Sequence, residues 1–458
     1  MSRKRLQFGA PPKRKTSQRK TNLESVPERF EADIENLTLE GRGVARVSGK
    51  TVFVSGALPG ERVSAHIQAR HKRYDEADTE QVLIESSERQ QPPCAHYDQC
   101  GGCQLQHLRP EAQLSYKEQL ILDQLSRFAD TVPEQVASPL TSDDLGYRRS
   151  ARIGINQRSS GELIIGFRRQ NSNKLLDIDR CPVLDPRINQ LLESLRDLLA
   201  EQEGIKHLTH LDISCGDTAS ALTIRVTRAP DETLLESIGN TCAAQGFALY
   251  IEDNSGNVVQ ISADPKQLSY GVLNGKLNLQ FAPGDFLQVN AAINHQMIEQ
   301  ALEWLAPRAT DRVLDLFCGL GNFTLPLATR AGRVVGVEGS AEMVSRAKNN
   351  AKANGLDNAE FFKSDLSADI RESVWYQQTR QSGFDLILLD PPRSGAEACV
   401  QRLADYGARA VLYISCNPAA LVRDTQHMKK AGYRMTRFAV MDMFPHTAHV
   451  ESMALFQC

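Results

Sequence analysis

Hydrophobic and polar residues alternate in short runs near the N-terminus, between about Arg29 and Glu85. These runs include Thr51-Val-Phe-Val and Glu61-Arg-Val-Ser-Ala-His-Ile, and glycine or proline separates them. Successive side chains of a strand point to opposite faces, so this alternation is typical of half-buried strands. Several short strands at such spacing predict a small all-β barrel. We assign residues 28–87 to it.

The last third of the chain has a different pattern, in which continuous apolar runs alternate with segments of helical periodicity. Continuous apolar runs are typical of parallel strands that are buried on both faces. The pattern therefore predicts a doubly wound, Rossmann-like α/β domain over residues 286–458. Its apolar runs begin at Val313, Val334, Phe384 and Ala410.

The middle of the chain, residues 88–285, mixes strand-like and helical patterns after a cysteine-rich segment. We interpret it as a separate α+β domain. A helix is predicted over residues 110–128, and packing of this helix on the C-terminal domain is an alternative to a place in the middle domain. The expected fold class is thus α/β, with an OB-like N-terminal barrel, a central α+β domain and a C-terminal Rossmann-like domain.

Charge is distributed unevenly along a chain whose formal net charge is only −3. Residues 1–27 form a basic tail that we expect to be disordered, with eight lysines and arginines and no acidic residue before position 21. Such a tail often contacts polyanions, although a solvated tail without a partner is the alternative. A second surface that could face RNA is predicted from Arg148, Arg149, Arg152, Arg158, Arg168 and Arg169.

No apolar run approaches the roughly 20 residues that a membrane-spanning helix needs. The charged N-terminus is not followed by the apolar core of a secretory signal. We therefore expect a cytoplasmic protein without a membrane partner. In that compartment the ten cysteines are expected to be ligands, nucleophiles or core residues rather than disulfides.

A glycine-containing turn follows the apolar run at Val313 and precedes a helix. It reads Asp315-Leu-Phe-Cys-Gly-Leu-Gly-Asn-Phe-Thr, and Thr324 stands where a dinucleotide-binding turn would have its third glycine. Glu338 ends the next strand, where a carboxylate can accept from ribose hydroxyls. Asp365 follows a third strand and could receive an adenine amino group. The pattern favours an S-adenosylmethionine site, with a nicotinamide-type or purely structural turn as the alternative.

Two further motifs indicate the chemistry. Asp390-Pro-Pro-Arg and Ser415-Cys-Asn-Pro each follow an apolar strand, which places both at the ligand-binding edge of the sheet. Carbon 5 of uracil is a poor nucleophile and must first become enolate-like through addition at carbon 6. A cysteine thiolate suits this addition. Cys416 is therefore a candidate nucleophile, with a buried core cysteine as the alternative.

Four cysteines form a candidate metal site: Cys94, Cys100 and Cys103 are clustered, and Cys181 lies far downstream. Such a set could hold zinc or an iron–sulfur cluster, and the spacing does not separate the two. Unbound thiols are the remaining alternative.

Taken together, these motifs and His449-Val-Glu resemble the RNA uracil-C5 methyltransferases. The resemblance covers nearly the whole chain, because the N-terminal barrel looks like a TRAM domain and the cysteine segment also matches. The most similar type is the bacterial enzyme that acts on 23S rRNA, whereas the tRNA-modifying relatives lack both the barrel and the cysteines.

The resemblance implies Cys416 as the nucleophile and Glu451 as the base that removes the carbon 5 proton. It implies S-adenosyl-L-methionine as cofactor, 23S ribosomal RNA as partner, and a [4Fe-4S] cluster on Cys94, Cys100, Cys103 and Cys181. We expect a monomer. His446 and His449 are rival bases. The residues expected to contact S-adenosylmethionine are Gln288, Phe317, Asn322, Glu338, Asp365 and Asp390.

Other functions remain open. The enzyme could methylate another RNA uracil, in tRNA or elsewhere in 23S rRNA. A cytosine-C5 methyltransferase would also use a cysteine, but Asp390-Pro-Pro-Arg argues against it. A non-catalytic iron–sulfur RNA-binding protein, in which Cys416 would be incidental, is a third possibility.

Overall fold

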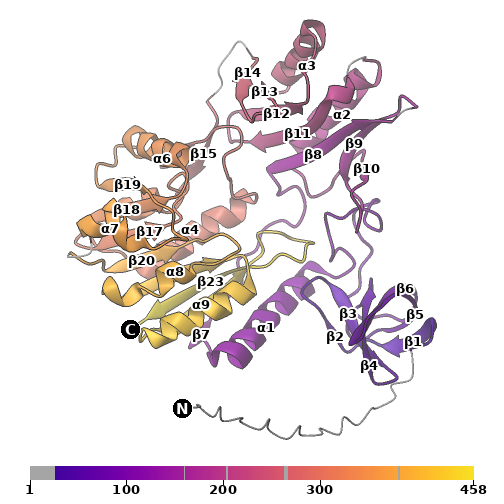
Figure 1. Ribbon diagram of the computed structural model, residues 1–458, viewed down its shortest axis with the longest axis horizontal. Coiled ribbons are helices and arrows are strands. Elements are labelled where there is room, and N and C mark those ends of the chain that lie inside the picture. The colour runs from indigo at the N-terminus through magenta and orange to yellow at the C-terminus, as the bar shows by residue number, and fades with distance from the viewer. Residues whose placement is uncertain (1–25, 159, 203–204, 263–266, 380–381) are drawn as a thin grey trace, which may run out of the picture. The chain divides into compact units, whose positions relative to one another are not determined.

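A computed structural model of the chain describes residues 26–158, 160–202, 205–262, 267–379 and 382–458 (Figure 1). All but the last two residues of the predicted basic tail lie outside these ranges. The chain divides into two compact units, residues 1–87 and 88–458. Each is described by itself.

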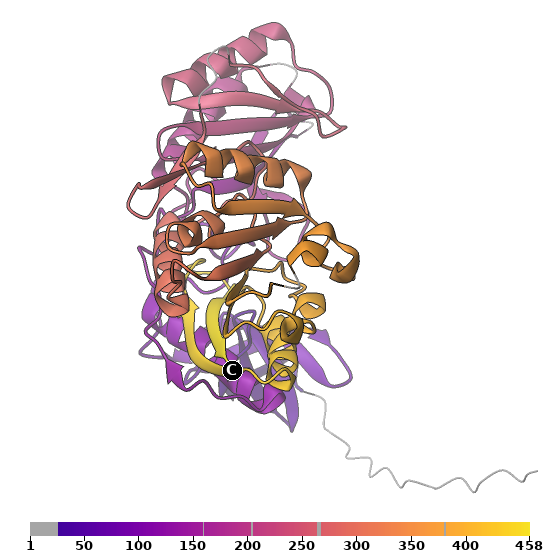
Figure 2. The ribbon, with the colours of Figure 1, turned by 90° about the vertical axis from the view of Figure 1, so that its left-hand side faces the viewer.

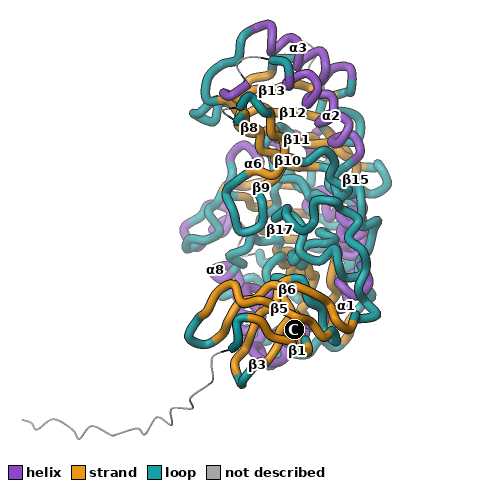
Figure 3. The backbone as a smooth tube through the Cα atoms, turned by 90° about the vertical axis from the view of Figure 1, so that its right-hand side faces the viewer, coloured by secondary structure: helices purple, strands orange, loops and turns teal. Residues whose placement is uncertain are grey.

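The first unit is a six-stranded sheet with the strand order β1-β5-β6-β4-β3-β2. The sheet curls, so that β1 also contacts β3, and Figure 3 shows its strands in orange around a common interior. Val52, Val54 and Val63 lie in that interior and are fully buried. The predicted barrel is confirmed. Its strands are β1 (Arg29–Asp33), β2 (Asn36–Leu37), β3 (Arg42–Val47), β4 (Lys50–Ser55), β5 (Arg62–Arg70) and β6 (Tyr74–Ile84).

The second unit contains a seven-stranded, mostly antiparallel sheet with the order β10-β9-β8-β11-β12-β13-β14. Two helices, α2 (Pro186–Ala200) and α3 (Glu232–Ala244), pack against each other and against β11 and β13 (Figure 1). The strands are β8 (Ser150–Gln157), β9 (Leu163–Arg168), β10 (Leu175–Asp177), β11 (Leu208–Cys215), β12 (Ser220–Val226), β13 (Phe247–Glu252) and β14 (Val258–Gln260), and η1 (Ile205–His207) precedes β11.

An eight-stranded sheet with the order β19-β18-β17-β20-β21-β23-β22-β7 forms the C-terminal part of this unit. The first five strands are parallel, whereas β23 runs antiparallel to both β21 and β22. This is the expected Rossmann-like sheet. Its strands are β7 (Gln135–Val136), β17 (Arg312–Leu316), β18 (Arg333–Glu338), β19 (Ala359–Lys363), β20 (Leu386–Leu389), β21 (Ala410–Ser415), β22 (Arg434–Met441) and β23 (Glu451–Gln457).

Helices cover both faces of the eight-stranded sheet. Figure 2 shows the salmon helix α4 on one side and the yellow helix α9 on the other. Helix α1 packs against α9 and β22, although more than 280 residues of sequence separate it from α9. The helices are α1 (Pro110–Ala129), α4 (Ala291–Leu305), α5 (Thr324–Ala328), α6 (Ala341–Ala353), α7 (Val374–Thr379), α8 (Glu397–Val400) and α9 (Pro418–Lys430), with η2 (Ile370–Glu372) and η3 (Leu403–Asp405).

The hairpin of β15 (Ser269–Val272) and β16 (Leu277–Gln280) shares its core with the eight-stranded sheet. Leu279 of the hairpin is fully buried there, as are Leu386 and Leu388 of β20. Within the described ranges, the structure contains no helix that is both long and apolar enough to span a bilayer.

Candidate active site

The carboxyl ends of the parallel strands form one edge of the eight-stranded sheet. Strand order reverses between β17 and β20, because the chain proceeds from β17 outward to β18 and β19 before β20 joins on the other side. Ligands of open α/β sheets bind in the crevice at such a point. Phe317 follows β17, Asp390 follows β20 and Cys416 follows β21, so all three lie along this edge.

The glycine-containing turn after β17 bends back sharply onto the sheet. Phe317 and Gly321 both have a left-handed backbone, with φ values of +67° and +91°. At position 321 glycine adopts this conformation without strain. A Cβ at Gly321 would lie 2.3 Å from Leu325 Cδ1, so the position also lacks room for a side chain. The Gly319 N–H donates to Glu338 Oε2 at 3.2 Å. The turn and Glu338, both predicted to bind the cofactor, are thus joined.

Gln288 and Asp390 are brought together from 102 positions apart: Gln288 Nε2 donates to Asp390 Oδ2 at 3.5 Å. Arg149 holds the segment that carries Gln288, since its Nε donates to the Gln288 carbonyl at 2.8 Å. Only 5% of Arg149 is exposed, and its guanidinium lies over the Tyr270 ring. The assignment of Arg149 to an RNA-facing surface was therefore wrong: its side chain is buried under the Gln288 segment.

Asn322 and Asp365 have partners within the protein. Asn322 Oδ1 accepts from Tyr270 Oη and from Asn294 Nδ2, both at 3.1 Å, and its Nδ2 donates to Asn294 Oδ1. Asp365 follows β19, at the outer end of the sheet, and is exposed. Its Oδ1 accepts from the Ser367 N–H and hydroxyl, which lowers its pKa.

Cys416 and Glu451 meet through the pairing of β21 with β23. The antiparallel register ends at Ser415↔Ser452, so the next position on each strand sets Cys416 opposite Glu451. The turn after Cys416 is held by Asn417, whose Oδ1 accepts from the Ala419 N–H and caps α9. Asn417 Nδ2 also donates to the Arg393 carbonyl at 2.8 Å. The two loop motifs are thereby fastened to each other.

Burial and mutual repulsion raise the pKa values of the acids at this edge. Burial, followed by the nearby Glu451 and Asp390 carboxylates, raises the pKa of the Cys416 thiol to about 11, whereas the charge of Arg393 opposes this shift. Burial also raises the pKa of Asp390 to about 7. Burial and then Asp390 raise the pKa of Glu451 well above its ordinary value. Closely spaced, partly buried acids of this kind are typical of sites that transfer protons.

The two histidines that rival Glu451 have different surroundings. His449 is exposed, and its Nδ1 lies 3.1 Å from an Arg393 guanidinium nitrogen. Neighbouring groups nevertheless desolvate part of its ring, and this desolvation, followed by the charge of Arg393, lowers its pKa. His446 is completely buried, with its ring between Gln113 and Asp144. Of the two histidines, His449 is therefore the one that the nucleobase of an incoming RNA could reach.

The four predicted metal-binding cysteines line one cavity of about 320 Å³, together with Tyr97, Tyr147 and His449. Burial, with a smaller contribution from the neighbouring cysteines, raises the pKa of the Cys103 thiol to about 12 and that of Cys181 to about 11. Across the described ranges, no three histidine, cysteine, aspartate or glutamate side chains converge closely enough to hold a single metal ion. A [4Fe-4S] cluster takes one thiolate on each of its four irons, and four thiols around a shared cavity match that number.

Several residues of the site escaped the sequence reasoning. Arg149, Tyr270 and Asn294 support Gln288 and Asn322, but a buried arginine and an asparagine inside α4 resemble surface residues in a sequence. Only the apolar periodicity of α4 could have indicated Asn294, since it lies beside Ile293 and Met297 on the buried side.

Comparison with known proteins identifies the family. The family model described as tRNA (Uracil-5-)-methyltransferase matches residues 109–457, and that of the TRAM domain matches residues 25–79. The chain belongs to the tRNA (uracil-5-)-methyltransferase family. The prediction of a methyltransferase with an N-terminal TRAM barrel is confirmed.

Relatives within the family are similar over nearly their whole length. The chain is 45% identical to 23S rRNA (uracil(1939)-C(5))-methyltransferase RlmD of Pseudomonas aeruginosa over 93% of both chains. It is 42% identical to the protein of the same name in Hahella chejuensis, over 94% of this chain and 97% of that one. The crystal structure of Pyrococcus abyssi tRNA (uracil-54, C5)-methyltransferase with S-adenosyl-L-homocysteine shares the fold, with a TM-score of 0.72 and 24% identity over 93% of this chain and 99% of that one.

Proposed function

We propose that this member of the uracil-5-methyltransferase family methylates carbon 5 of a uracil in 23S rRNA through a covalent adduct on Cys416. The observation that carries the proposal is the register of β21 and β23, which sets Cys416 and Glu451 opposite each other at the ligand-binding edge. Addition at carbon 6 and proton removal at carbon 5 take place at neighbouring atoms of one ring. Each step needs a different group within reach of that ring, and this pair supplies both.

In the proposed reaction the Cys416 thiolate adds to carbon 6 of the uracil, and the electrons of the C5–C6 bond move toward carbon 5 and oxygen 4. S-adenosylmethionine, when bound, supplies the electrophilic methyl group. Carbon 5 then carries both a methyl group and its original proton. The Glu451 carboxylate takes that proton, the C5–C6 double bond forms again, and the C6–S bond breaks to return the thiolate.

The residues at the turn after β17 would hold S-adenosylmethionine. Glu338 lies where ribose hydroxyls are bound in this class of fold, and Gly321 leaves the backbone open to a close approach. Gln288 and Asp390, joined at 3.5 Å, lie between the turn and Cys416 along the same edge. We also assign Phe317, Asn322 and Asp365 to this site. Asp365 would have to release Ser367 to accept from an adenine amino group.

We further propose a [4Fe-4S] cluster on Cys94, Cys100, Cys103 and Cys181. The shared cavity and the proximity of the four thiols support it. Thiolate ligation would tie the cysteine segment to the loop that precedes α2, since Cys181 stands shortly before that helix. The cluster would then stabilise the structure, because metal binding adds its free energy to that of folding.

The choice of 23S rRNA rests on the two relatives, whose names give that substrate. The test is transfer of labelled methyl groups from S-adenosylmethionine to unmodified 23S rRNA, to tRNA, and to RNA in which cytosine replaces the target uracil. Labelled 5-methyluridine in 23S rRNA alone is expected. Methylation of tRNA or cytosine would contradict the substrate, and no transfer at all would favour a non-catalytic RNA-binding protein.

The covalent step is tested by two substitutions and a denaturing gel. Glu451→Gln can add and methylate but cannot remove the proton, so an RNA–protein adduct should accumulate. Cys416→Ala should give neither adduct nor product. His449→Gln tests the rival base, because an adduct trapped by that variant, with normal turnover by Glu451→Gln, would transfer the role of base to His449.

A further inference from the structure

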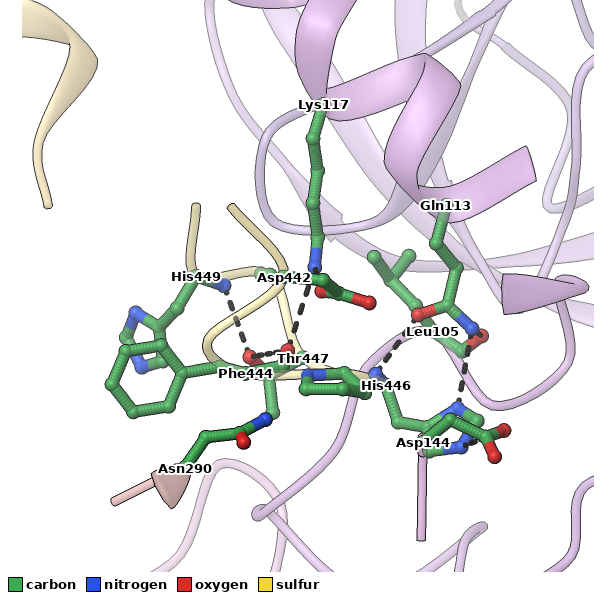
Figure 4. A network of polar contacts seen from close by, with 12 residues as sticks. Leu105, Gln113, Lys117, Asp144, Asn290, Asp442, Phe444, His446, Thr447 and His449 are labelled. Atoms are coloured by element: carbon green, nitrogen blue, oxygen red, sulfur yellow. Dashed lines mark hydrogen bonds and ion pairs between the residues drawn. The ribbon is translucent and has the colours of Figure 1, made fainter. Parts of the chain in front are cut away.

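The loop of residues 442–450, which joins β22 to β23, leads directly into Glu451. It is fastened by side chains from distant parts of the sequence (Figure 4). Lys117 Nζ donates to Asp442 Oδ1 at 3.0 Å, and Tyr147 Oη donates to the Pro445 carbonyl at 3.1 Å. Inside the loop, Thr447 Oγ1 donates to the Phe444 carbonyl and accepts from the His449 N–H. Hydrogen bonds inside the loop thus restrict its conformation, and those from Lys117 and Tyr147 attach it to the rest of the protein.

His446 stands at the centre of this arrangement. Its backbone is left-handed, with φ +67°, and none of its surface is exposed. The His446 N–H donates to Gln113 Oε1 at 2.9 Å, which fixes the orientation of that amide. Gln113 Nε2 then faces the Leu105 and Leu108 carbonyls, at 3.0 and 2.7 Å, and His446 Nδ1, at 3.2 Å. Because an amide NH2 group cannot accept a hydrogen bond, a proton on Nδ1 would have no acceptor there. The ring proton therefore resides on Nε2, which faces Asp144 Oδ2 at 3.0 Å.

The His446 carbonyl is occupied as well. It accepts from the N–H groups of Gln104 and Leu105 at 3.0 and 2.9 Å. Both residues come directly after Cys103, so the cysteine segment lies against the loop. The N–H, carbonyl and Nδ1 of His446 thus all have hydrogen-bond partners within the protein, and Nε2 lies within ion-pair distance of Asp144. This is the environment of a residue that holds structure in place rather than one that exchanges protons.

We propose that His446 is a positioning residue: held by Gln113 and Asp144, it fixes the loop of residues 442–450 and with it the place of Glu451 opposite Cys416. The inference rests on the proposed function, because it takes Glu451 as the base. Glu451 lies five positions after His446 in the sequence. A displacement of His446 would therefore also displace Glu451, because the chain between them is short and held by hydrogen bonds. A misplacement of about 1 Å in a catalytic group can cost on the order of 100-fold in rate.

Asp144→Ala is the variant that tests this role with the least disturbance of the protein core. The Asp144 side chain is 39% exposed, so its removal leaves no large buried cavity, while His446 loses the acceptor for its ring proton. We expect kcat to fall between about 10-fold and 100-fold, with the KM for RNA unchanged. Proton removal should be the slowed step. A methylated RNA–protein adduct should therefore accumulate during turnover, as it should with Glu451→Gln.

Three companion variants separate positioning from general damage. Asp143→Ala removes the same charge one residue away, at an exposed position, and should behave as the wild type. Asp144→Asn retains an oxygen that accepts from His446 Nε2, and should restore turnover. His446→Asn keeps a side chain that tolerates the left-handed backbone but cannot reach Gln113 and Asp144 together, so it should resemble Asp144→Ala.

Glu451→Gln, assayed in parallel, distinguishes the two ideas. If it turns over normally, the proposed function itself fails. If it traps the adduct while Asp144→Ala turns over within twofold of the wild type, only the positioning role is overturned. The role is also overturned if Asp144→Ala changes KM alone, lowers kcat without adduct, or is not rescued by Asp144→Asn. A lower kcat with trapped adduct and rescue supports it.

Discussion

Cys416 stands opposite Glu451 across the antiparallel pair of β21 and β23, one position beyond the Ser415↔Ser452 pair. The carboxylate therefore acts directly on the thiol. Burial is the largest cause of the raised pKa of Cys416, about 11, and the charge of Glu451 is the next. A nucleophile and a base that must work in succession thus influence each other before any substrate arrives.

Alkylation of Cys416 should report this coupling. Below a pKa of about 11 the thiolate fraction rises tenfold per pH unit, so the rate with iodoacetamide should rise about tenfold per unit between pH 7 and 10. Glu451→Gln removes a negative charge that disfavours the thiolate, so its curve should shift to lower pH. Mass spectrometry of the Cys416 peptide measures both curves, with the exposed Cys458 as internal control. Identical curves would show that the carboxylate does not influence the thiol, and a shift to higher pH would show that it favours the thiolate, contrary to this prediction.

The buried ion pair of Lys117 and Asp442 should matter for stability. Their side chains are only 2% and 8% exposed, with Nζ and Oδ1 3.0 Å apart. Removing one partner leaves an uncompensated buried charge, which typically costs about 3–5 kcal/mol. Lys117→Met and Asp442→Asn should each lower the midpoint of thermal unfolding by several degrees. The double variant should lose less than the sum of the two, and strictly additive losses would argue against a direct interaction.

Substitution of one cavity cysteine should remove the metal and weaken the fold. Cys181→Ser, purified without oxygen, is expected to contain little iron and to unfold at a lower temperature than the wild type. Cys242→Ser is the matched control, since Cys242 lies on the buried face of α3 and not at the cavity. Elemental analysis with a visible spectrum measures the iron. Zinc in place of iron in the wild-type protein would contradict the cluster.

The basic tail should contribute affinity for RNA but no chemistry. Each neutralised phosphate releases counterions, so binding weakens steeply with salt. A chain without residues 1–20 loses eight basic residues, and the slope of log affinity against log salt should become shallower. Turnover at saturating RNA should stay within about twofold of the full chain. A slope that does not change would show that the tail takes no part in binding.

The pattern of apolar runs was sufficient to predict the barrel and the parallel part of the large sheet. Strands β17, β18, β20 and β21 are largely buried on both faces, so their sequences are mostly apolar and easily recognised. The edge that carries Asp390 and Cys416 follows from these strands alone. The place of Glu451 does not, because it depends on the register of an antiparallel strand, and a slip of one residue would turn its side chain to the other face.

The contacts that hold the loop of residues 442–450 could not be predicted from the local pattern of polar and apolar residues. Gln113 and Lys117 lie on the buried stripe of α1 together with Leu114, Ile121 and Leu125. A glutamine and a lysine four residues apart in a helix usually indicate a solvent-facing side. They are buried here because their partners, His446 and Asp442, come from a loop more than 320 residues away. Only the assembled structure shows that these charges and amides are matched.

The small strand β7 bears on how this protein can be divided. Residues 134–140 run alongside β22, with hydrogen bonds from Glu134, Ala137 and Leu140 to carbonyls of that strand. They cover a strand that would otherwise present a free edge, and such edges recruit strands from other molecules. A gene fragment that began at residue 286 would encode the remaining strands of the sheet without this cover. We expect its product to aggregate. Residues 286–458 could therefore be transferred to another protein only together with residues 134–140, which are encoded about 150 residues upstream.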